Sequence, residues 1–504
     1  MSRRRVAAVA GIAALALAGC GSTVQVRSTG TVGQDGLGTA GTTGEGLSAN
    51  TGSGTSGSPV GTTTGGTSGV SLGGSSTGGT SGTTTGAPLG TTGGSGSGAT
   101  SGTTTGGVKS RTPVKVGVIY ASGVGAAAAA MGIPGLATGD NQAQAAAVIA
   151  WINAHGGVGG HPIKPVYWDI AKHQGSNAES SMQIACAGLT QDEHVQYVQS
   201  IAGIPQSGMA CFAKAGVGVL DDETGLGDGD MAKYAAHLGT PGEIAPGRMT
   251  SIVVDDLWKR GWLNKSSKVG VFSADSSGAH SVVDKFLTPA LARYGLKAAK
   301  TVYVNPDGGD GGSAASSSAV LQFRSAGVDR VIPVQYSPLF FMATASSQGY
   351  HPAYALYSNL GPGALLESTV PKDQLKNAVG IGWQPYLDIG AGKMPGPVSP
   401  RETLCFDIMK KAGQASTSAT TKGFQVQVCN VLFYLMDMSL KVDPTVPKTL
   451  LTSGRSFVGG TFVPADTFKV DVTKRTDGVA GYRRLAYQED CSCFQYVSGV
   501  LVAP

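Results

Sequence analysis

Two neighbouring stretches decide the fold of this chain: VKVGVIY at 114–120 and AWINAHGGVGGHPI at 150–163. The first is an apolar run of the length of a β-strand. The second closes a helix expected over 140–154, whose apolar residues recur at helical spacing and which stops at a pair of glycines. A further strand, expected over 163–168, follows at once. A strand, a helix and a strand in this order predict a βαβ unit with parallel strands.

The same alternation continues through most of the chain and restarts after about residue 250, which predicts two similar lobes. We therefore expect an α/β fold with two Rossmann-like lobes. Further strands are expected at 195–198, 217–220, 268–272, 301–304, 331–334 and 354–357, with β-structure and loops over 461–501. Helices are expected at 205–215, 280–294, 338–349 and 424–440, with Pro205 and Pro338 opening two of them.

The N-terminus has the pattern of an export signal. Arg3 to Arg5 precede a short apolar run that ends in Leu17-Ala18-Gly19-Cys20, and this order is typical of a secretory signal peptide over 1–20. The last four residues resemble the lipobox of bacterial lipoproteins, which implies that Cys20 is acylated and becomes the first residue of the mature chain. We expect a lipid-anchored protein on the extracytoplasmic face of the cell membrane. An ordinary signal peptide that carries a cysteine is the alternative.

Residues 21–110 are dominated by glycine, serine and threonine and contain no aromatic residue. Such a segment cannot bury enough apolar surface to offset its chain entropy, so we expect a disordered tether. Its root-mean-square reach is on the order of 50 Å. The net charge of the whole chain is only +5, with scattered basic residues, so no nucleic-acid partner is expected.

The cysteines fit an oxidising compartment. Of the 7 cysteines, those other than Cys20 form an even set, which favours disulfides. We expect a Cys186–Cys211 bond and a Cys405–Cys429 bond, because each pair lies on consecutive predicted helices. Cys491 and Cys493 remain, but they are two residues apart, and a bond between them is the least secure of the three.

The opening stretches resemble those of type I periplasmic binding proteins of the leucine-binding class. Those proteins commonly show a strand, a helix that ends in INAxGGVxGxxI and a strand that ends in Asp, here Asp169. The resemblance continues at KVGVFSADSSG (268–278) and AGVDRVI (326–332). It implies two lobes joined by three crossings, a small-molecule ligand held between them, and delivery to an ABC permease. The expected first lobe is 111–249 with 380–455, and the expected second lobe is 250–379 with 456–504.

Parallel sheets bind ligands beyond the carboxyl ends of their strands, where loops and helix N-termini offer free N–H donors. The candidate ligand-binding residues are therefore those that follow the predicted strands, together with two aromatic residues, Tyr336 and Trp383, that could cover an apolar part of a ligand. The others are Ser122, Ser200, Ala202, Gly203, Asp222, Glu223, Thr224, Asp275, Ser276, Ser277, Ser358 and Asn359.

The chain departs from the amino-acid receptors at two of these positions. Ser277 precedes Gly278 where those receptors tend to have a tyrosine, and Gln335 and Tyr336 follow the strand at 331–334 without an obvious carboxylate for an ammonium group. The ligand class thus stays open between an amino acid, an amide, a short peptide and an aromatic acid. We expect a monomer that needs no cofactor or metal.

Three other functions compete with solute capture. The segment GVGAAA at 123–128 fits the G-x-G-x-x-A dinucleotide pattern, but the next strand starts about 40 residues later, outside a compact βαβ unit. A secreted hydrolase would need a nucleophile elbow or an H-E-x-x-H motif, which the folded part of the sequence does not contain. A ligand sensor or surface-interaction protein with the same fold remains an alternative.

Overall fold

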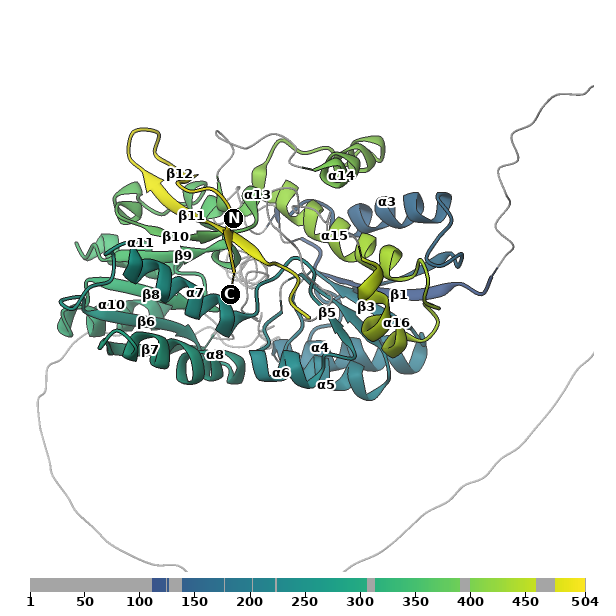
Figure 1. Ribbon diagram of the computed structural model, residues 1–504, viewed down its shortest axis with the longest axis horizontal. Helices are drawn as coiled ribbons and strands as arrows, with labels where there is room; N and C mark the ends of the chain where they lie inside the picture. The colour runs from purple at the N-terminus through teal and green to yellow at the C-terminus, as the bar shows by residue number, and fades with distance from the viewer. Residues whose placement is uncertain are drawn as a thin grey trace, which may run out of the picture. The chain divides into compact units, whose positions relative to one another are not determined.

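The computed structural model describes residues 111–503, apart from 124, 127–137, 176, 202, 223, 306–312, 390–398 and 459–475. The predicted signal peptide (1–20) with Cys20, the predicted tether (21–110), and the candidate site residues Ala202 and Glu223 lie outside the described residues. The described part of the chain forms two sheets, one parallel and one mixed, with helices packed on them (Figure 1).

The first sheet is parallel throughout and has the strand order β2-β1-β3-β4-β5. Its strands are β1 (Val114–Tyr120), β2 (Ile163–Asp169), β3 (Tyr197–Ser200), β4 (Gly218–Leu220) and β5 (Leu238–Gly239). The alternation of side chains along β1 gives the sheet two apolar faces. Val116 and Val118 lie in one buried cluster, and Ile119 lies in another.

Helices from both ends of the chain cover the first sheet. The face of Val116 packs against α3 (Asn141–Ala154), α14 (Pro400–Lys411), α15 (Ala419–Met438) and α16 (Pro447–Ser453). The face of Ile119 packs against α4 (Ala178–Ala187), α5 (Gln206–Lys214) and the short α6 (Asp228–Lys233). The sheet with these helices is called the first lobe below.

The second sheet has the order β7-β6-β8-β9-β10-β11-β12, with β13 paired to β11. Its parallel strands are β6 (Val269–Ala274), β7 (Ala298–Val304), β8 (Arg330–Val334), β9 (Ala353–Tyr357) and β10 (Val379–Gly382). An antiparallel set extends it, namely β11 (Gly481–Gln488), β12 (Cys493–Tyr496) and β13 (Leu501–Val502). In Figure 1 the yellow β11 runs beside β10.

The helices of the second sheet pack against it in one large apolar cluster. They are α7 (Pro246–Lys259), α8 (Ser277–Val282), η3 (Val283–Leu287), α9 (Thr288–Ala292), α10 (Ser313–Ser325), α11 (Leu339–Ser347) and α12 (Pro362–Leu366). Shorter turns are η4 (Ser358–Leu360), η5 (Lys372–Leu375) and α13 (Pro385–Asp388). The second sheet with these elements is called the second lobe.

The chain passes between the lobes three times: after β5, after β10 and after α16. The first and third crossings lie side by side, because the Thr240 N–H donates to the Thr476 carbonyl (3.0 Å) and the Gly478 N–H donates to the Thr240 carbonyl (2.9 Å). The first crossing comes earlier than the expected boundary at 249, since α7 already packs in the second lobe. The second comes later than 380, since β10 pairs with β9 and β11.

Several element boundaries differ from those expected. The strand expected at 195–198 is β3 at Tyr197–Ser200, because His194 has a left-handed backbone (φ 53°) and the Val195 N–H still bonds to the Leu189 carbonyl. Pro205 and Pro338 are not the first helical residues but the N-cap positions of α5 and α11. The helix expected at 424–440 is α15, which begins at Ala419 behind the Ser418 cap.

The two disulfides expected between helices are confirmed: Cys186–Cys211 joins α4 to α5, and Cys405–Cys429 joins α14 to α15. The less secure pair is also bonded, between Cys491 and Cys493. Among the described residues, no helix combines the length and the apolar character that spanning a membrane requires.

Candidate functional site

The predicted residues of the first lobe lie at the carboxyl ends of β1, β3 and β4. After β1, the Ser122 N–H donates to the Asp169 carboxylate (3.0 Å). After β3, the Ser200 hydroxyl donates to the carbonyl of Gly203, which has a left-handed backbone (3.1 Å, φ 72°). After β4, Thr224 donates its N–H and its hydroxyl to the carboxylate of Glu243 (both 3.2 Å). Hydrogen bonds to nearby residues thus hold the loops at this edge of the first sheet.

In the second lobe, the residues that follow β6 form the start of α8. The Ser276 hydroxyl accepts from the N–H of Ala279 and so caps this helix (3.2 Å). Asp275 is exposed and lies 2.8 Å from a ring nitrogen of His280. The Ser277 hydroxyl reaches the other lobe, where it donates to the side-chain oxygen of Gln206 (2.9 Å).

The remaining candidates of the second lobe are more deeply placed. Tyr336 is buried with its ring edge against Phe272, and Trp383 is 0% exposed. Asn359 follows β9, and its side-chain oxygen is buried without a hydrogen-bond partner among the described residues. Because both aromatic rings are buried here, their role in covering a ligand remains a prediction that requires the lobes to part.

The two edges approach each other closely. The carbonyl oxygen of Gly225, in the loop after β4, would lie 2.7 Å from a Cβ atom placed on Gly278 of α8. Gly227 lies over the same turn of that helix. A side chain at position 278 would therefore hold the lobes apart, and together with the Ser277 bond this contact defines a closed arrangement.

Asp222 is a buried carboxyl at the carboxyl ends of the first-lobe strands. One carboxylate oxygen accepts from the Gly242 N–H of the first crossing, and the other accepts from the Asn430 amide of α15 (both 2.7 Å). These bonds favour the ionised form, but burial has the larger effect and raises the pKa of Asp222 to about 7.

The hydrogen bonds around Asp222 continue through the Gly242 carbonyl to residues of the second crossing. This carbonyl accepts from the Trp383 indole (3.1 Å) and from the Gln384 amide (3.4 Å). Gln384 in turn accepts from the amide of Gln427 on α15 (3.3 Å). Hydrogen bonds therefore connect the Asp222 carboxylate to both lobes and to two of the crossings.

A second buried carboxyl, Asp388, continues the network in α13. One of its oxygens accepts from the hydroxyls of Tyr496 (2.5 Å) and Ser358 (3.1 Å) and from the Gln384 N–H (3.0 Å). Burial again outweighs these donors and raises the pKa of Asp388 to about 7. The Ser358 hydroxyl also accepts from the Trp383 N–H (2.8 Å), so this predicted site residue acts here as a link in the network.

Two small cavities flank this network and share Gln427. The first is a small hollow, open to solvent, at the ends of β3 and β4. It is lined by Gln199, Ser200, Ile201, Asp221, Asp222, Gln427, Val428 and Val431. The second is a small hollow beside α13, also open to solvent, and is lined by Gln384, Pro385, Tyr386, Leu387, Gly423, Val426, Gln427 and Asn430.

Two buried acceptor atoms belong to residues that line these cavities. The side-chain oxygens of Gln199 and Asn430 have no hydrogen-bond partner among the described residues. A buried carbonyl oxygen without a donor is unfavourable, and a ligand N–H can satisfy it. The cavities thus present carboxylate and amide oxygens that suit a ligand with N–H donors.

The sequence analysis missed several members of this site, namely Gln199, Gly242, Gln384, Asp388, Gln427, Asn430 and Tyr496. A signal existed for two of them. Gln427 and Asn430 are three residues apart on a largely buried helix, so they share one face. Polar residues that recur on one face of a buried helix mark a polar contact, whereas Tyr496 lies 108 residues from its partner Asp388 and carries no local signal.

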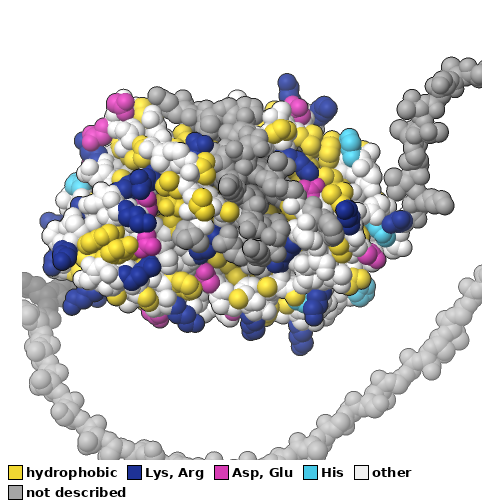
Figure 2. Space-filling model, in the orientation of Figure 1, with side chains coloured by type: hydrophobic (Ala, Val, Ile, Leu, Met, Phe, Trp, Pro, Cys, Tyr) yellow, Lys and Arg dark blue, Asp and Glu magenta, His cyan; other side chains and the backbone are white. Residues whose placement is uncertain are grey.

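No group of three metal-ligating side chains occurs within the described ranges. On the face shown in Figure 2, Lys and Arg side chains are scattered among other residues and do not gather in one patch.

The sequence matches no protein-family model, and no curated protein matches it. Solved structures do match its fold. A solute-binding protein of an ABC transporter from Rhodopseudomonas palustris, in complex with p-hydroxybenzoic acid, aligns with a TM-score of 0.54 at 14% identity. That alignment covers 78% of this chain and 97% of the other.

Two further structures give the same result. The branched-chain amino acid transporter substrate-binding protein of Streptococcus pneumoniae, in complex with isoleucine, aligns with a TM-score of 0.53 at 13% identity over 77% of this chain and 99% of its own. A substrate-binding periplasmic protein of Ralstonia solanacearum aligns with a TM-score of 0.55 at 13% identity over 76% and 99%. This chain therefore has the two-lobed α/β fold of these substrate-binding proteins.

Proposed function

We propose that this protein captures a small solute between its two lobes and delivers it to an ABC permease. The observation that carries the proposal is the cavity at the carboxyl ends of β3 and β4, whose wall combines the Asp222 carboxyl with the unsatisfied oxygen of Gln199. The fold supports it, since parallel α/β sheets bind ligands at this edge. Binding would act by population shift, with ligand contacts to both lobes favouring the closed arrangement.

The ligand we propose carries at least one N–H donor, as an amino acid, an amide or a short peptide does. The oxygens of Gln199, Asn430 and Asp222 support this class, because each is an acceptor at a cavity wall. An aromatic acid is the second candidate, because the Rhodopseudomonas palustris protein of the same fold is in complex with p-hydroxybenzoic acid.

We further propose that the chain acts outside the cytoplasm as a monomer, held to the membrane by a lipid on Cys20 and a tether over 21–110. The export pattern of the first 20 residues supports this placement. In this role the protein binds without catalysis and needs no cofactor. A sensor that uses the same cleft is the alternative function, and the identity of the membrane partner distinguishes the two.

Isothermal titration calorimetry of the full chain against amino acids, amides, short peptides and aromatic acids tests the proposal. We expect one class to bind saturably, and Gln199→Leu to weaken that binding roughly tenfold through loss of one buried hydrogen bond. Gln322→Leu on α10 is the matched control and should bind as the native chain does. Turnover of the bound compound, or no binding of any class by the folded chain, would refute solute capture.

A further inference from the structure

The turn between β11 and β12 holds a disulfide unlike the other two. Cys491 and Cys493 are bonded across a separation of 2 residues, whereas the other bonds span 25 and 24 residues. The intervening residue, Ser492, has a left-handed backbone (φ 47°), which a residue other than glycine seldom adopts. The ring that this disulfide closes is short, so it restricts the unfolded chain little. In the folded chain it imposes an uncommon backbone conformation on Ser492.

The same turn is accessible to solvent. Glu489, Asp490 and Ser492 are exposed and Cys491 is partly exposed, while Cys493 is 9% exposed. By contrast, Cys405 and Cys429 are each 0% exposed, and in the third bond Cys186 is 0% exposed while Cys211 is partly exposed. A thiolate from solution can thus reach the sulfur of Cys491, whereas it reaches the Cys405–Cys429 bond only when a helix pair opens.

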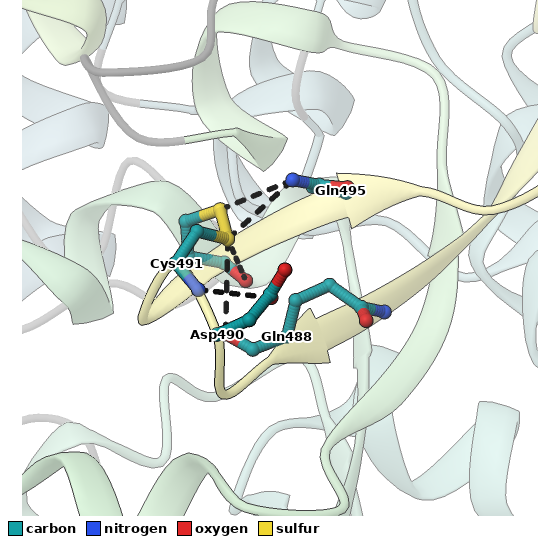
Figure 3. The surroundings of a disulfide bond; sticks show 5 residues. Gln488, Asp490, Cys491 and Gln495 are labelled. Atoms are coloured by element: carbon teal, nitrogen blue, oxygen red, sulfur yellow. Dashed lines mark hydrogen bonds between the residues drawn. A yellow bond between two sulfur atoms is a disulfide. The ribbon is translucent and has the colours of Figure 1, made fainter.

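A single side chain contacts both sulfur atoms. The amide of Gln495 on β12 lies 3.4 Å from the Cys491 sulfur and 3.5 Å from the Cys493 sulfur, with its N–H₂ directed at the bond (Figure 3). An amide donor stabilises a thiolate more than a neutral sulfur, so it favours departure of either cysteine as a leaving group. The Asp490 carboxylate accepts from the Cys491 N–H (2.8 Å).

We propose that Cys491–Cys493 is a thiol–disulfide exchange site that reacts with a dithiol partner, while the two interhelical disulfides are structural. A thiolate of the partner attacks the Cys491 sulfur, the bond between the cysteines breaks, and its electron pair leaves with Cys493 as a thiolate next to Gln495. The second thiol of the partner then displaces Cys491 from the mixed disulfide. Two electrons pass to the turn, the partner becomes a disulfide, and each cysteine thiolate takes up one proton.

Graded reduction of the full chain with dithiothreitol tests this assignment, with free thiols blocked by an alkylating reagent and mapped by peptide mass spectrometry. We expect Cys491 and Cys493 to be labelled roughly tenfold faster than the other four cysteines or more, with circular dichroism unchanged. Labelling of Cys405 and Cys429 at the same rate, or loss of secondary structure on reduction of the turn, would overturn the proposal.

Glutathione serves as the second probe, because a monothiol leaves a mixed disulfide that can be located. The adduct is expected on Cys491, and an adduct mainly on Cys493 would contradict the direction of attack. Gln495→Ala should slow the reduction several-fold. The matched control is Gln488→Ala on β11, whose side chain points away from the sulfurs in Figure 3 and which should react at the native rate. Equal rates for the two variants would remove Gln495 from the mechanism.

Discussion

Ionisation of Asp388 should make the folded chain less stable as the pH rises from about 4 to about 7. Its pKa is about 7 in the folded protein because the carboxyl is buried, whereas the ordinary value is 3.8. The unfolded chain therefore releases this proton at a lower pH than the folded chain does. The stability that the neutral carboxyl provides is complete below pH 4, is lost as the pH rises toward 7, and changes no further above it.

The size of this effect follows from the shift of about three pH units. At 1.36 kcal/mol per unit, Asp388 accounts for a loss of about 4 kcal/mol in the free energy of unfolding between pH 4 and pH 7. Asp388→Asn removes the ionisable group, so the decrease over this range should be smaller by up to about 4 kcal/mol. The asparagine amide also needs an acceptor in a buried site, which lowers stability at every pH by about 1–3 kcal/mol and leaves the pH slope unaffected.

The assay is guanidinium unfolding followed by circular dichroism at pH 4.5, 5.5, 6.5 and 7.5. Asp407→Asn, which alters an exposed carboxylate on α14, is the control and should keep the native slope. Tyr496→Phe should extend the pH-dependent range upward, because it removes the donor at 2.5 Å that favours the ionised Asp388. A slope for Asp388→Asn equal to the native one would refute the assignment of this proton to Asp388.

Three further outcomes are expected. Asn430→Ala removes a donor to Asp222 and should lower the free energy of unfolding at neutral pH by about 1–3 kcal/mol, measured by the same denaturation. It should also move the pH range over which Asp222 affects stability to higher pH. Gly278→Ala places a methyl group against the Gly225 carbonyl and should weaken ligand binding and enlarge the radius of gyration in small-angle scattering, whereas Gly229→Ala, which meets open space, should do neither. Loss of the Cys405–Cys429 bond in a paired serine variant should cost about 3 kcal/mol in unfolding experiments, more than loss of Cys491–Cys493, because its loop is longer.

The sequence predicted the elements whose signal is local. The apolar run of β1 has the expected bounds, and the helix before the glycine pair begins one residue after its Asp140 cap. The start of α15 was placed too late because Thr420, Thr421 and Lys422 interrupt the apolar pattern before Phe424. The two-residue strand β5 was missed because it exists only through its pairing with β4.

The candidate site was predicted in position more than in chemistry. Small polar residues after the strands do lie at the two facing edges, and Asp222 and Ser200 line a cavity there. Their partners could not be predicted, because Asn430 lies 208 residues from Asp222 and comes from a helix that follows the parallel strands of the second sheet in the chain. Hydrogen bonds between distant segments depend on the tertiary fold, and one sequence carries no periodic trace of them.

The origin of the helices that cover β1 has a consequence for biogenesis. Its Val116 and Val118 face is sealed by α14, α15 and α16, which belong to residues 400–453. During synthesis part of this apolar face of the first sheet therefore stays uncovered until residues 400–453 have been made. A chain stopped at residue 399 would leave that part of the face exposed and should aggregate, so a chaperone would have a defined stretch to protect.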